Sequence, residues 1–428
     1  MPRILPEKTM KLNRNQLTFV FGGAALFSGA AFLFAYLPSF GPVIYENTPS
    51  VGGAVLTGGE VDVEPPVLHI PTPEPVHGLY MTQCIVGTPL LRNNLIQLVK
   101  DTSLNTVVID IKDYSGTIAF RTGDPLFAGA ELVQCGASDM KEFIKKLHED
   151  GIYVVGRITV FQDPYYTSKY PEAAVKRASD PHVVWEDYKG LAFVDVGART
   201  FWDYIVALSK ASYAIGFDEL NFDYIRYPSD GNMKDTYYSH SLGKEKSVAL
   251  EEFYVYLNNA LKPVGVVLSA DLFGMVTTNE DDLNIGQVLE RALPYFDYID
   301  PMVYPSHYPK GFRGHVNVNE HAYDIVNFSL ARAVERTIAT TTRVASFVSM
   351  PIASTTPQLY EKPAYPASRI RPWLQSFDYP VVYTPDMVDA QIRATHDAGL
   401  ESYLFWDAAN KYRSLREVLT QTAITTEI

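Results

Sequence analysis

The sequence predicts an α/β protein: a (β/α)8 barrel, or TIM barrel, preceded by one N-terminal transmembrane helix and a Pro/Gly-rich linker. Three observations support this prediction. A run of 21 residues without a charge spans 17–37, and a segment rich in Pro and Gly follows at 38–75. From residue 76 to 428, short apolar runs alternate with amphipathic segments. Repeated strand–helix units favour parallel strands joined by right-handed crossovers, and eight such units make a closed barrel.

The N-terminal part is predicted to place the barrel outside the cytoplasm. Residues 1–16 carry four basic side chains against one acidic one and are expected to form a short cytoplasmic tail. The run at 17–37 is long enough to cross a bilayer as a helix. A cleaved signal peptide is the alternative, but no clear cleavage site of small residues follows the run. We therefore expect a single-pass anchor in the cell membrane. Residues 38–75 are interpreted as an extended tether, or alternatively as an ordered arm packed on the barrel.

The alternation from residue 77 onward gives each barrel element in turn. The expected strands are 77–82, 106–112, 153–159, one within 216–228, 265–271, 298–303, a seventh, and 402–406. The expected helices are 91–101, 139–148, 200–214, 247–261, 285–293, 320–339, 386–398 and 414–420. Two segments, 344–352 and 370–374, compete for the seventh strand. A doubly wound open sheet is disfavoured because no Gly-rich phosphate turn follows the first strands.

The fourth strand has an unusual load of charge. Side chains alternate between the faces of a strand. One face of this strand carries Glu219, Asn221 and Asp223, and the other carries Leu220, Phe222 and Tyr224. Burying charge is costly unless the groups are paired or bind a ligand. We expect a barrel wall with a polar site at its mouth, with Asp223 at the active end, Glu219 deeper in the barrel and Asp218 in a structural role.

Polar or aromatic residues stand near the C-terminal ends of most predicted strands, where (β/α)8 barrels carry their chemistry. The candidate site residues are Asp110, Lys112, Arg157, Asn221, Asp223, Arg226, Asp271, Tyr304, His307, Trp373, Gln375 and Trp406. Structural interpretations compete with functional ones. Asp110 and Lys112 could form a buried pair, Arg157 could hold a neighbouring carboxylate, and a lone loop histidine such as His307 is more often a surface residue. Trp406 is either core or a floor for a sugar ring.

Composition excludes several classes of function. The formal net charge of −13 leaves no basic excess to neutralise phosphates, so no nucleic-acid partner is expected. The nine histidines are scattered and there are two cysteines, Cys84 and Cys135, so no metal site and no cofactor is expected. The two cysteines could form a disulfide in an oxidising compartment. Nothing in the pattern indicates an oligomeric state.

The stretch GFDELNFDYIRYPSDG at 216–231 resembles a bacterial family of glycoside hydrolase-like proteins, a domain of unknown function related to the α-amylase-like (β/α)8 barrels. Other blocks resemble it in the same order, among them TVVIDIKDYSG at 106–116, SADLFG at 269–274 and FWDAAN at 405–410. The resemblance covers roughly 77–412. It implies that Asp223 is the nucleophile and that Asp271 is the partner acid, although the amylase-like enzymes usually have Glu as proton donor. At 191–197, Phe193 and Val196 also depart from the expected Trp and Pro.

Two functions are compatible with these observations. The first is a membrane-anchored glycoside hydrolase that cleaves an envelope or environmental polysaccharide outside the cytoplasm, with a catalytic pair of carboxylates. Asp223 would be the nucleophile or base and Asp271 the acid, while the other candidate residues would orient the carboxylates or bind the carbohydrate substrate. The alternative is a catalytically degenerate barrel that binds carbohydrate or organises the cell envelope.

Overall fold

The computed structural model describes residues 67–426. The predicted cytoplasmic tail, the predicted membrane anchor at 17–37 and most of the predicted linker lie outside the described residues. Within the described residues, none of the helices combines the length and the apolar character needed to span a bilayer.

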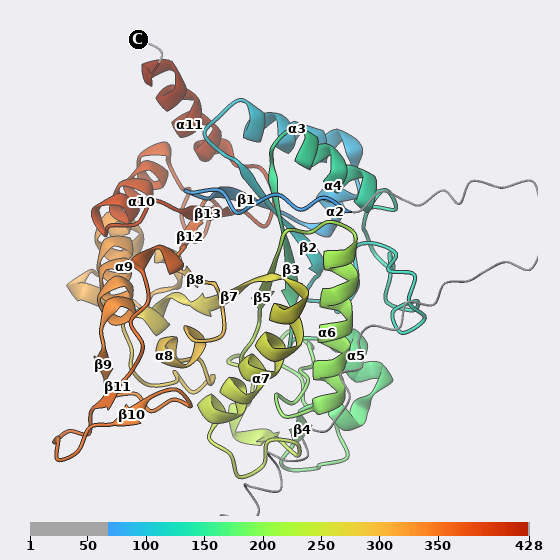
Figure 1. Cartoon of the computed structure of the whole chain (residues 1–428), viewed down its shortest axis with the longest axis vertical. Helices are drawn as coiled ribbons and strands as arrows, with labels where there is room; N and C mark the ends of the chain where they lie inside the picture. The colour runs from blue at the N-terminus through green and yellow to red at the C-terminus, as the bar shows by residue number, and fades with distance from the viewer. Residues whose placement is uncertain (1–66, 427–428) are drawn as a thin grey trace, which may run out of the picture. The chain divides into compact units, whose positions relative to one another are not determined.

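In this part of the chain, eight parallel strands close into a barrel in the order β1-β13-β12-β8-β7-β5-β3-β2 (Figure 1). The predicted (β/α)8 barrel is therefore confirmed. The strands are β1 (His77–Met81), β2 (Thr106–Lys112), β3 (Tyr153–Thr159), β5 (Glu219–Asp223), β7 (Val267–Phe273), β8 (Tyr298–Met302), β12 (Trp373–Gln375) and β13 (Tyr403–Trp406).

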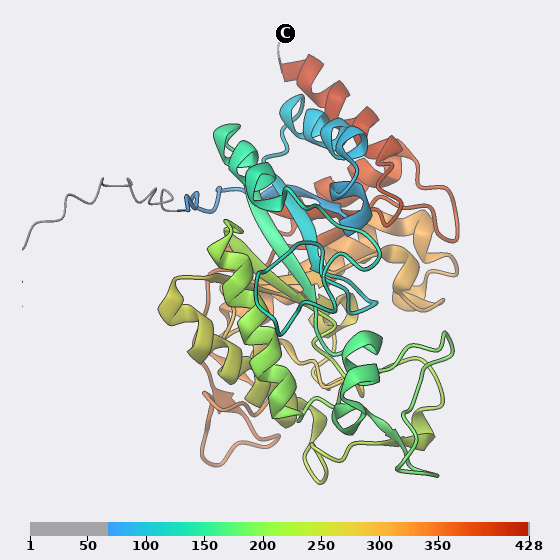
Figure 2. The same cartoon turned by 90° about the vertical axis from the view of Figure 1, so that its right-hand side faces the viewer.

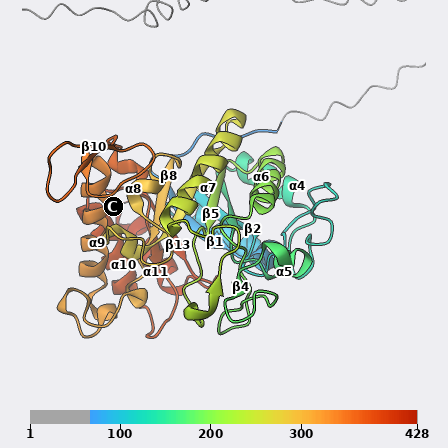
Figure 3. The same cartoon turned by 90° about the horizontal axis from the view of Figure 1, so that it is seen from below.

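Amphipathic helices cover the outside of the strands, as the view from below shows (Figure 3). In α4 (Met140–Glu149), Phe143, Ile144 and Leu147 are buried, whereas Lys145 and Lys146 face solvent, because a 3.6-residue period keeps apolar side chains on one stripe. The other helices are α2 (Gln83–Val86), α3 (Pro89–Lys100), α5 (Pro164–Lys169), α6 (Arg199–Ala214), α7 (Lys246–Leu261), α8 (Leu289–Ala292), α9 (Ala322–Ile338), α10 (Pro385–Asp397) and α11 (Arg413–Thr426).

Two predicted elements differ from the structure. The helix expected at 285–293 is reduced to α8, because Gly286 has a positive φ and Val288 is extended. The seventh barrel strand is β12, which overlaps the predicted segment 370–374 and does not overlap the competing segment 344–352. It is short because Pro372 has no N–H to donate to a ladder. In 344–352, only Met350–Pro351 forms a strand (β10), which belongs to a small sheet with β11 (Tyr360–Glu361) and β9 (Thr341–Thr342).

A buried ionic layer fills the lower interior of the barrel. Arg371 is fully buried and contacts the carboxylates of Glu219 and Asp300, with 2.9 Å between its Nη2 and Asp300 Oδ2. Asn221 Nδ2 lies 3.1 Å from Asp300 Oδ2 and 2.9 Å from Asp271 Oδ1, so it links this layer to the carboxylates above. The polar face of β5 thus lies inside the barrel, and Leu220 and Phe222 pack outward in the main hydrophobic core.

The residues just before β1 pack on the N-terminal end of the barrel. The backbone N–H of Ile70 donates to Asp218 at 2.8 Å, and the Thr72 and Tyr153 hydroxyls are 2.9 Å apart. The His69 ring stacks on Tyr213 with 4.0 Å between centroids. The described end of the segment predicted as a tether is therefore an ordered arm, which was the alternative interpretation. We call residues 67–75 the N-terminal arm.

Loops at the other end of the barrel are longer. The connections that follow β3 and β5 pair through two short strands, β4 (Lys176–Arg177) and β6 (Thr236–Tyr237), and project below the barrel as green loops in Figure 2. A disulfide joins Cys84, in α2, to Cys135, in the loop between β2 and α4. The sequence had left open whether these two cysteines are bonded. The long loops therefore lie at the end where the barrel strands terminate.

Candidate active site

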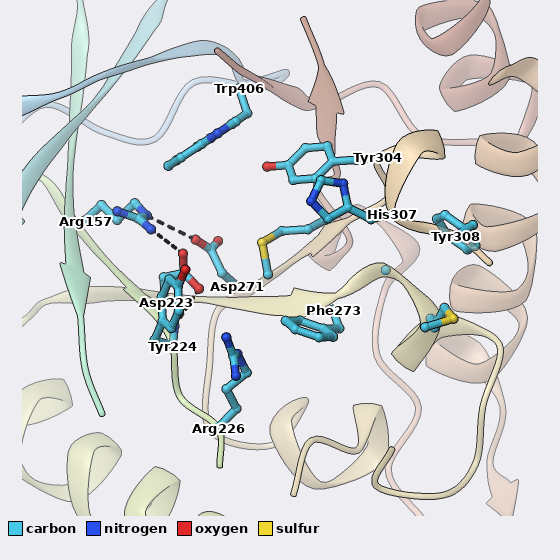
Figure 4. Close-up of a pocket in the computed structure, with 13 residues that line it drawn as sticks. Arg157, Asp223, Tyr224, Arg226, Asp271, Phe273, Tyr304, His307, Tyr308 and Trp406 are labelled. Atoms are coloured by element: carbon cyan, nitrogen blue, oxygen red, sulfur yellow. Dashed lines mark hydrogen bonds and ion pairs between the residues drawn. The ribbon is translucent and has the colours of Figure 1, made fainter. Parts of the chain in front are cut away.

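A cavity of about 340 Å³ opens among the C-terminal ends of the strands (Figure 4). Its ionic lining consists of Arg157, Asp223, Arg226 and Asp271. Its aromatic and apolar lining consists of Tyr224, Phe273, Met275, Met302, Tyr304, His307, Tyr308 and Trp406, with Gly274 between them. Both predicted catalytic carboxylates therefore open to one cavity.

Neighbouring strands bring the two carboxylates together. The parallel register pairs Asn221 with Ser269 and Phe222 with Ala270, so Asp223 and Asp271, one residue further, end at the same level. Adjacent strands lie roughly 4.8 Å apart, which places the two carboxyl groups side by side. Arg157 on β3 contacts both: its Nη2 donates to Asp223 Oδ2, and its Nε lies 3.7 Å from Asp271 Oδ2. One guanidinium thus holds the pair.

The two carboxyl groups have different surroundings. Burial raises the pKa of Asp271 well above its ordinary value, and the neighbouring charges of Asp223 and Asp300 raise it further. Asp271 Oδ1 accepts hydrogen bonds from Trp373 Nε1 at 2.7 Å and from Asn221. Asp223 instead accepts from Arg157 and from the backbone N–H of Tyr224. The environment therefore favours a protonated Asp271 beside an Asp223 that is paired with a cation.

Tyr224 departs from the predicted alternation. The strand ends at Asp223, and Tyr224 has a φ of 51°, in the left-handed region that few non-glycine residues adopt. This turn directs Tyr224 to the cavity rather than to the outer face that it was predicted to share with Phe222. A strand pattern carries no signal of a positive φ, so the sequence could not reveal this wall residue.

Five further predicted residues line the cavity. The Trp406 ring stacks on Tyr80 with 3.8 Å between centroids, and the Arg157 guanidinium lies 4.8 Å from the Trp406 ring centroid. The edge of His307 meets Tyr304, which is also buried. The predicted lining residues are Arg157, Arg226, Tyr304, His307 and Trp406.

Five other predicted site residues lie behind the cavity wall. Asp110 accepts from the Tyr80 hydroxyl and, at 2.6 Å, from Arg157 Nη1, and burial raises the pKa of Asp110 to about 6. Lys112 is fully buried and pairs with Asp163 at 2.8 Å. The remaining three, Asn221, Trp373 and Gln375, are buried and hydrogen-bonded to neighbours. These residues support the wall and do not contact the cavity.

The sequence prediction also missed the wall that follows β7 and β8. Phe273, Met275, Met302 and Tyr308 line the cavity there. A Cβ on Gly274 would lie 2.5 Å from the Met302 carbonyl oxygen, so this position needs glycine for the chain to pass. The glycine at the end of the SADLFG block was the available signal, because a glycine that closes a strand often marks a close backbone approach.

The barrel and its adjacent carboxylates have the architecture of a glycoside hydrolase-type (β/α)8 domain. The chain belongs to the family described as "putative glycosyl hydrolase domain", whose model matches residues 78–412. The family inferred from the sequence is therefore confirmed.

Solved structures resemble this chain. A hypothetical protein from Ruminiclostridium thermocellum is 34% identical, covering 45% of this chain and 96% of its own, with a TM-score of 0.41. The PgaB (BpsB) glycoside hydrolase domain from Bordetella bronchiseptica is 14% identical, covering 81% of this chain and 99% of its own, with a TM-score of 0.53. The α-L-fucosidase isoenzyme 2 from Paenibacillus thiaminolyticus is 11% identical, covering 82% and 49%, with a TM-score of 0.50. The latter two likenesses show the fold. No curated protein sequence matches the chain.

Proposed function

We propose that the protein is a glycoside hydrolase that cleaves polysaccharide outside the cytoplasm, held to the cell membrane by residues 17–37. One observation carries the enzymatic part of this proposal: Asp223 and Asp271 open to one cavity and share Arg157, yet differ in their surroundings. Two carboxyl groups with different proton affinities are what glycosidic hydrolysis requires.

The chemistry follows from those surroundings. Asp271 donates its proton to the glycosidic oxygen as the bond from that oxygen to the anomeric carbon breaks. Asp223 lies at the same level of the barrel and attacks the anomeric carbon, giving a covalent glycosyl ester. Asp271, now a carboxylate, takes a proton from water, and the resulting hydroxide equivalent cleaves the ester. Both carboxyl groups return to their starting states.

The register of β5 and β7 favours this retaining route. Retaining enzymes have carboxyl groups roughly 5–5.5 Å apart, whereas inverting enzymes need roughly 6.5–9.5 Å to admit a water. Two inward-facing residues at one level of adjacent strands fit the shorter spacing. We expect the first product detected by NMR to keep the anomeric configuration of the substrate.

Other features support a sugar ligand and an external location. Trp406, Tyr224 and Phe273 offer ring faces on which the C–H face of a sugar can stack. The disulfide between Cys84 and Cys135 supports an oxidising compartment, as expected for a domain on the outer side of the membrane.

The test is the variant Asp223→Asn. We expect hydrolysis of a cleaved polysaccharide to fall by several orders of magnitude, because the amide cannot attack, while the melting temperature stays close to that of the wild type. Asp389→Asn, which changes an aspartate on α10 paired with Arg393, serves as the matched control. The assignment is wrong if Asp223→Asn retains full activity against a substrate that the wild type cleaves.

A second candidate function is a carbohydrate-binding barrel without turnover. It is favoured by the burial of Asp271, whose residue is 1% exposed and whose Oδ1 accepts two hydrogen bonds. If the wild type turns over no glycan, and Asp223→Asn/Asp271→Asn binds sugar as tightly as the wild type, this function replaces the first.

A further inference from the structure

Arg226 is a buried cation that faces the cavity without a carboxylate of its own. The residue is 8% exposed, and both of its direct hydrogen bonds leave from Nη1, to the Tyr227 carbonyl and the Ser229 hydroxyl, each at 3.1 Å. Its guanidinium carbon lies 4.7 Å from the ring centroid of Tyr224 and 4.9 Å from that of Phe273. No ion pair of Arg226 occurs among residues 67–426. Burying a charge without an ion-pair partner costs free energy unless a ligand of opposite charge binds to it.

The charges of Asp223 and Asp187 act on Arg226 without forming an ion pair with it in the described part of the chain. Asp223 Oδ2 is held by Arg157, and its Oδ1 accepts the Tyr224 backbone N–H. Asp271 favours its neutral form, because burial and neighbouring carboxylates raise its pKa. Burial lowers the pKa of His307, which favours neutral imidazole. The cavity therefore offers an anion the guanidinium of Arg226, which forms no ion pair with a carboxylate of the described residues (Figure 4).

A second cavity of about 500 Å³ adjoins the first and shares Tyr304, His307 and Trp406 with it. Its lining includes the exposed cations Lys411 and Arg413, which have no ion-pair partner in the part of the chain that the structure describes.

The polar groups of this second cavity are arranged for a ligand. Asp378 accepts the Tyr383 backbone N–H at 2.8 Å, and Asp407 accepts backbone N–H groups, among them that of Tyr412. The Ser376 hydroxyl, 7% exposed at the residue level, is buried without a hydrogen-bond partner. An unpartnered hydroxyl in a cavity that two cations also line is suited to a polar, negatively charged ligand.

We propose that the substrate is an acidic polysaccharide. Arg226 binds an anionic substituent of the sugar in the catalytic cavity, and the chain continues over Trp406 into the second cavity, toward Lys411 and Arg413. The substituent is a carboxylate, as in a uronic acid, or a sulfate ester. This inference rests on the proposed function, because it names the substrate class of the same site.

The test measures binding separately from hydrolysis. Asp271→Asn is the background, since asparagine resembles the protonated carboxyl in shape and leaves the cavity charge unchanged. Titration calorimetry at constant ionic strength compares polygalacturonate with its carboxyl-reduced form, and dextran sulfate with dextran. We expect an acidic polysaccharide to bind more tightly than its neutral counterpart. Tighter binding of polygalacturonate identifies a carboxylate as the substituent, and tighter binding of dextran sulfate identifies a sulfate ester.

The variant Arg226→Met should weaken binding of that acidic chain by about tenfold or more, the loss expected for charge-assisted hydrogen bonds. Arg226→Lys, which keeps the charge, should bind the acidic chain with an affinity between those of the background and Arg226→Met. Arg393→Met on α10 should leave the affinity unchanged. Melting temperatures verify that each variant is folded. The inference is overturned if acidic chains bind no tighter than neutral ones, or if Arg226→Met binds them as the background does.

Failure of the inference and failure of the proposed function have different signatures. Hydrolysis of a neutral glycan that is unchanged by Arg226→Met refutes the acidic substrate and leaves the hydrolase intact. Binding of an acidic chain that depends on Arg226, with no hydrolysis by the wild type, supports the substrate class and removes the catalytic function.

Discussion

At the scale of single residues, Arg157 organises the site. It contacts Asp110, Asp223 and Asp271 from one guanidinium. A planar fork can satisfy several carboxylate oxygens at fixed angles, which a lysine ammonium cannot do. The sequence left open whether Arg157 has a structural or a functional role, and in the structure the two roles coincide. By holding the carboxylates, Arg157 sets their positions relative to the cavity.

Trp373 provides a prediction about the acid. Its Nε1 donates to Asp271 Oδ1, which favours the charged form of that carboxyl. Trp373→Phe removes the donor, so the pKa of Asp271 should rise further. If Asp271 is the proton donor as proposed, activity is lost as pH rises through that pKa, and the alkaline limb of the kcat profile should move to higher pH. An unmoved limb, or one displaced to lower pH, would contradict Asp271 as the acid.

Residue roles were only partly predictable from the sequence. The charged residues of the site could be found because parallel strands bring their C-terminal ends together. Which of them reach the cavity could not, because Asp110 and Arg157 are paired in register on neighbouring strands, yet only the longer Arg157 side chain lines the cavity, whereas the Asp110 carboxyl is held behind it by Tyr80 and Arg157. Tyr224 escaped prediction for another reason, its positive φ.

At the scale of elements, the lower barrel depends on one buried cation. Arg371 precedes β12 and contacts Glu219 of β5 and Asp300 of β8, all fully buried. The pKa of Asp300 is raised to about 6 by burial, even with Arg371 beside it. The arrangement ties three strands from different parts of the chain.

We predict that Arg371→Leu lowers the free energy of unfolding by about 3–5 kcal/mol near neutral pH, since it leaves two buried carboxylates unpaired. Without Arg371, whose charge lowers it, the folded-state pKa of Asp300 should rise further above its unfolded value, so stability is lost as pH rises through that pKa. Urea unfolding should show a larger deficit at pH 8 than at pH 5. Arg393→Leu should stay within about 0.5 kcal/mol of the wild type, and an equal loss in both variants would refute the role of the buried layer.

Elements were predictable where periodicity is long and strong. β2, β3 and α6 fall close to their predicted ranges because alternation and helical spacing follow from which face is buried. The seventh strand and α8 were poorly predicted because they are short, three and four residues, and are limited by Pro372 and Gly286. Whether such short elements form depends on pairing with residues far away in the sequence, and the local sequence pattern carries no information on that pairing.

At the scale of the whole molecule, the N-terminal arm closes the end of the barrel opposite the cavity. Its contacts to Asp218, Tyr153 and Tyr213 involve residues at or before the starts of strands. Residues at this end of a (β/α)8 barrel serve stability rather than chemistry.

Removing the arm is the corresponding prediction. A chain that begins at residue 76 should be about 3 kcal/mol less stable than one that begins at residue 66, from two or three hydrogen bonds and one aromatic stack. Its kcat should not change, because the cavity lies at the far end. Chemical denaturation and kinetics on the two chains check both expectations, and identical unfolding midpoints would show that the arm contributes nothing.

The position of the arm also fixes where the chain enters the barrel. The chain enters the barrel at the pole opposite the cavity mouth. The cavity mouth is therefore clear of the segment that leads into β1. A long polymer can then cross the mouth in either direction without meeting the incoming chain, so the entry segment sets no limit on the length of the ligand.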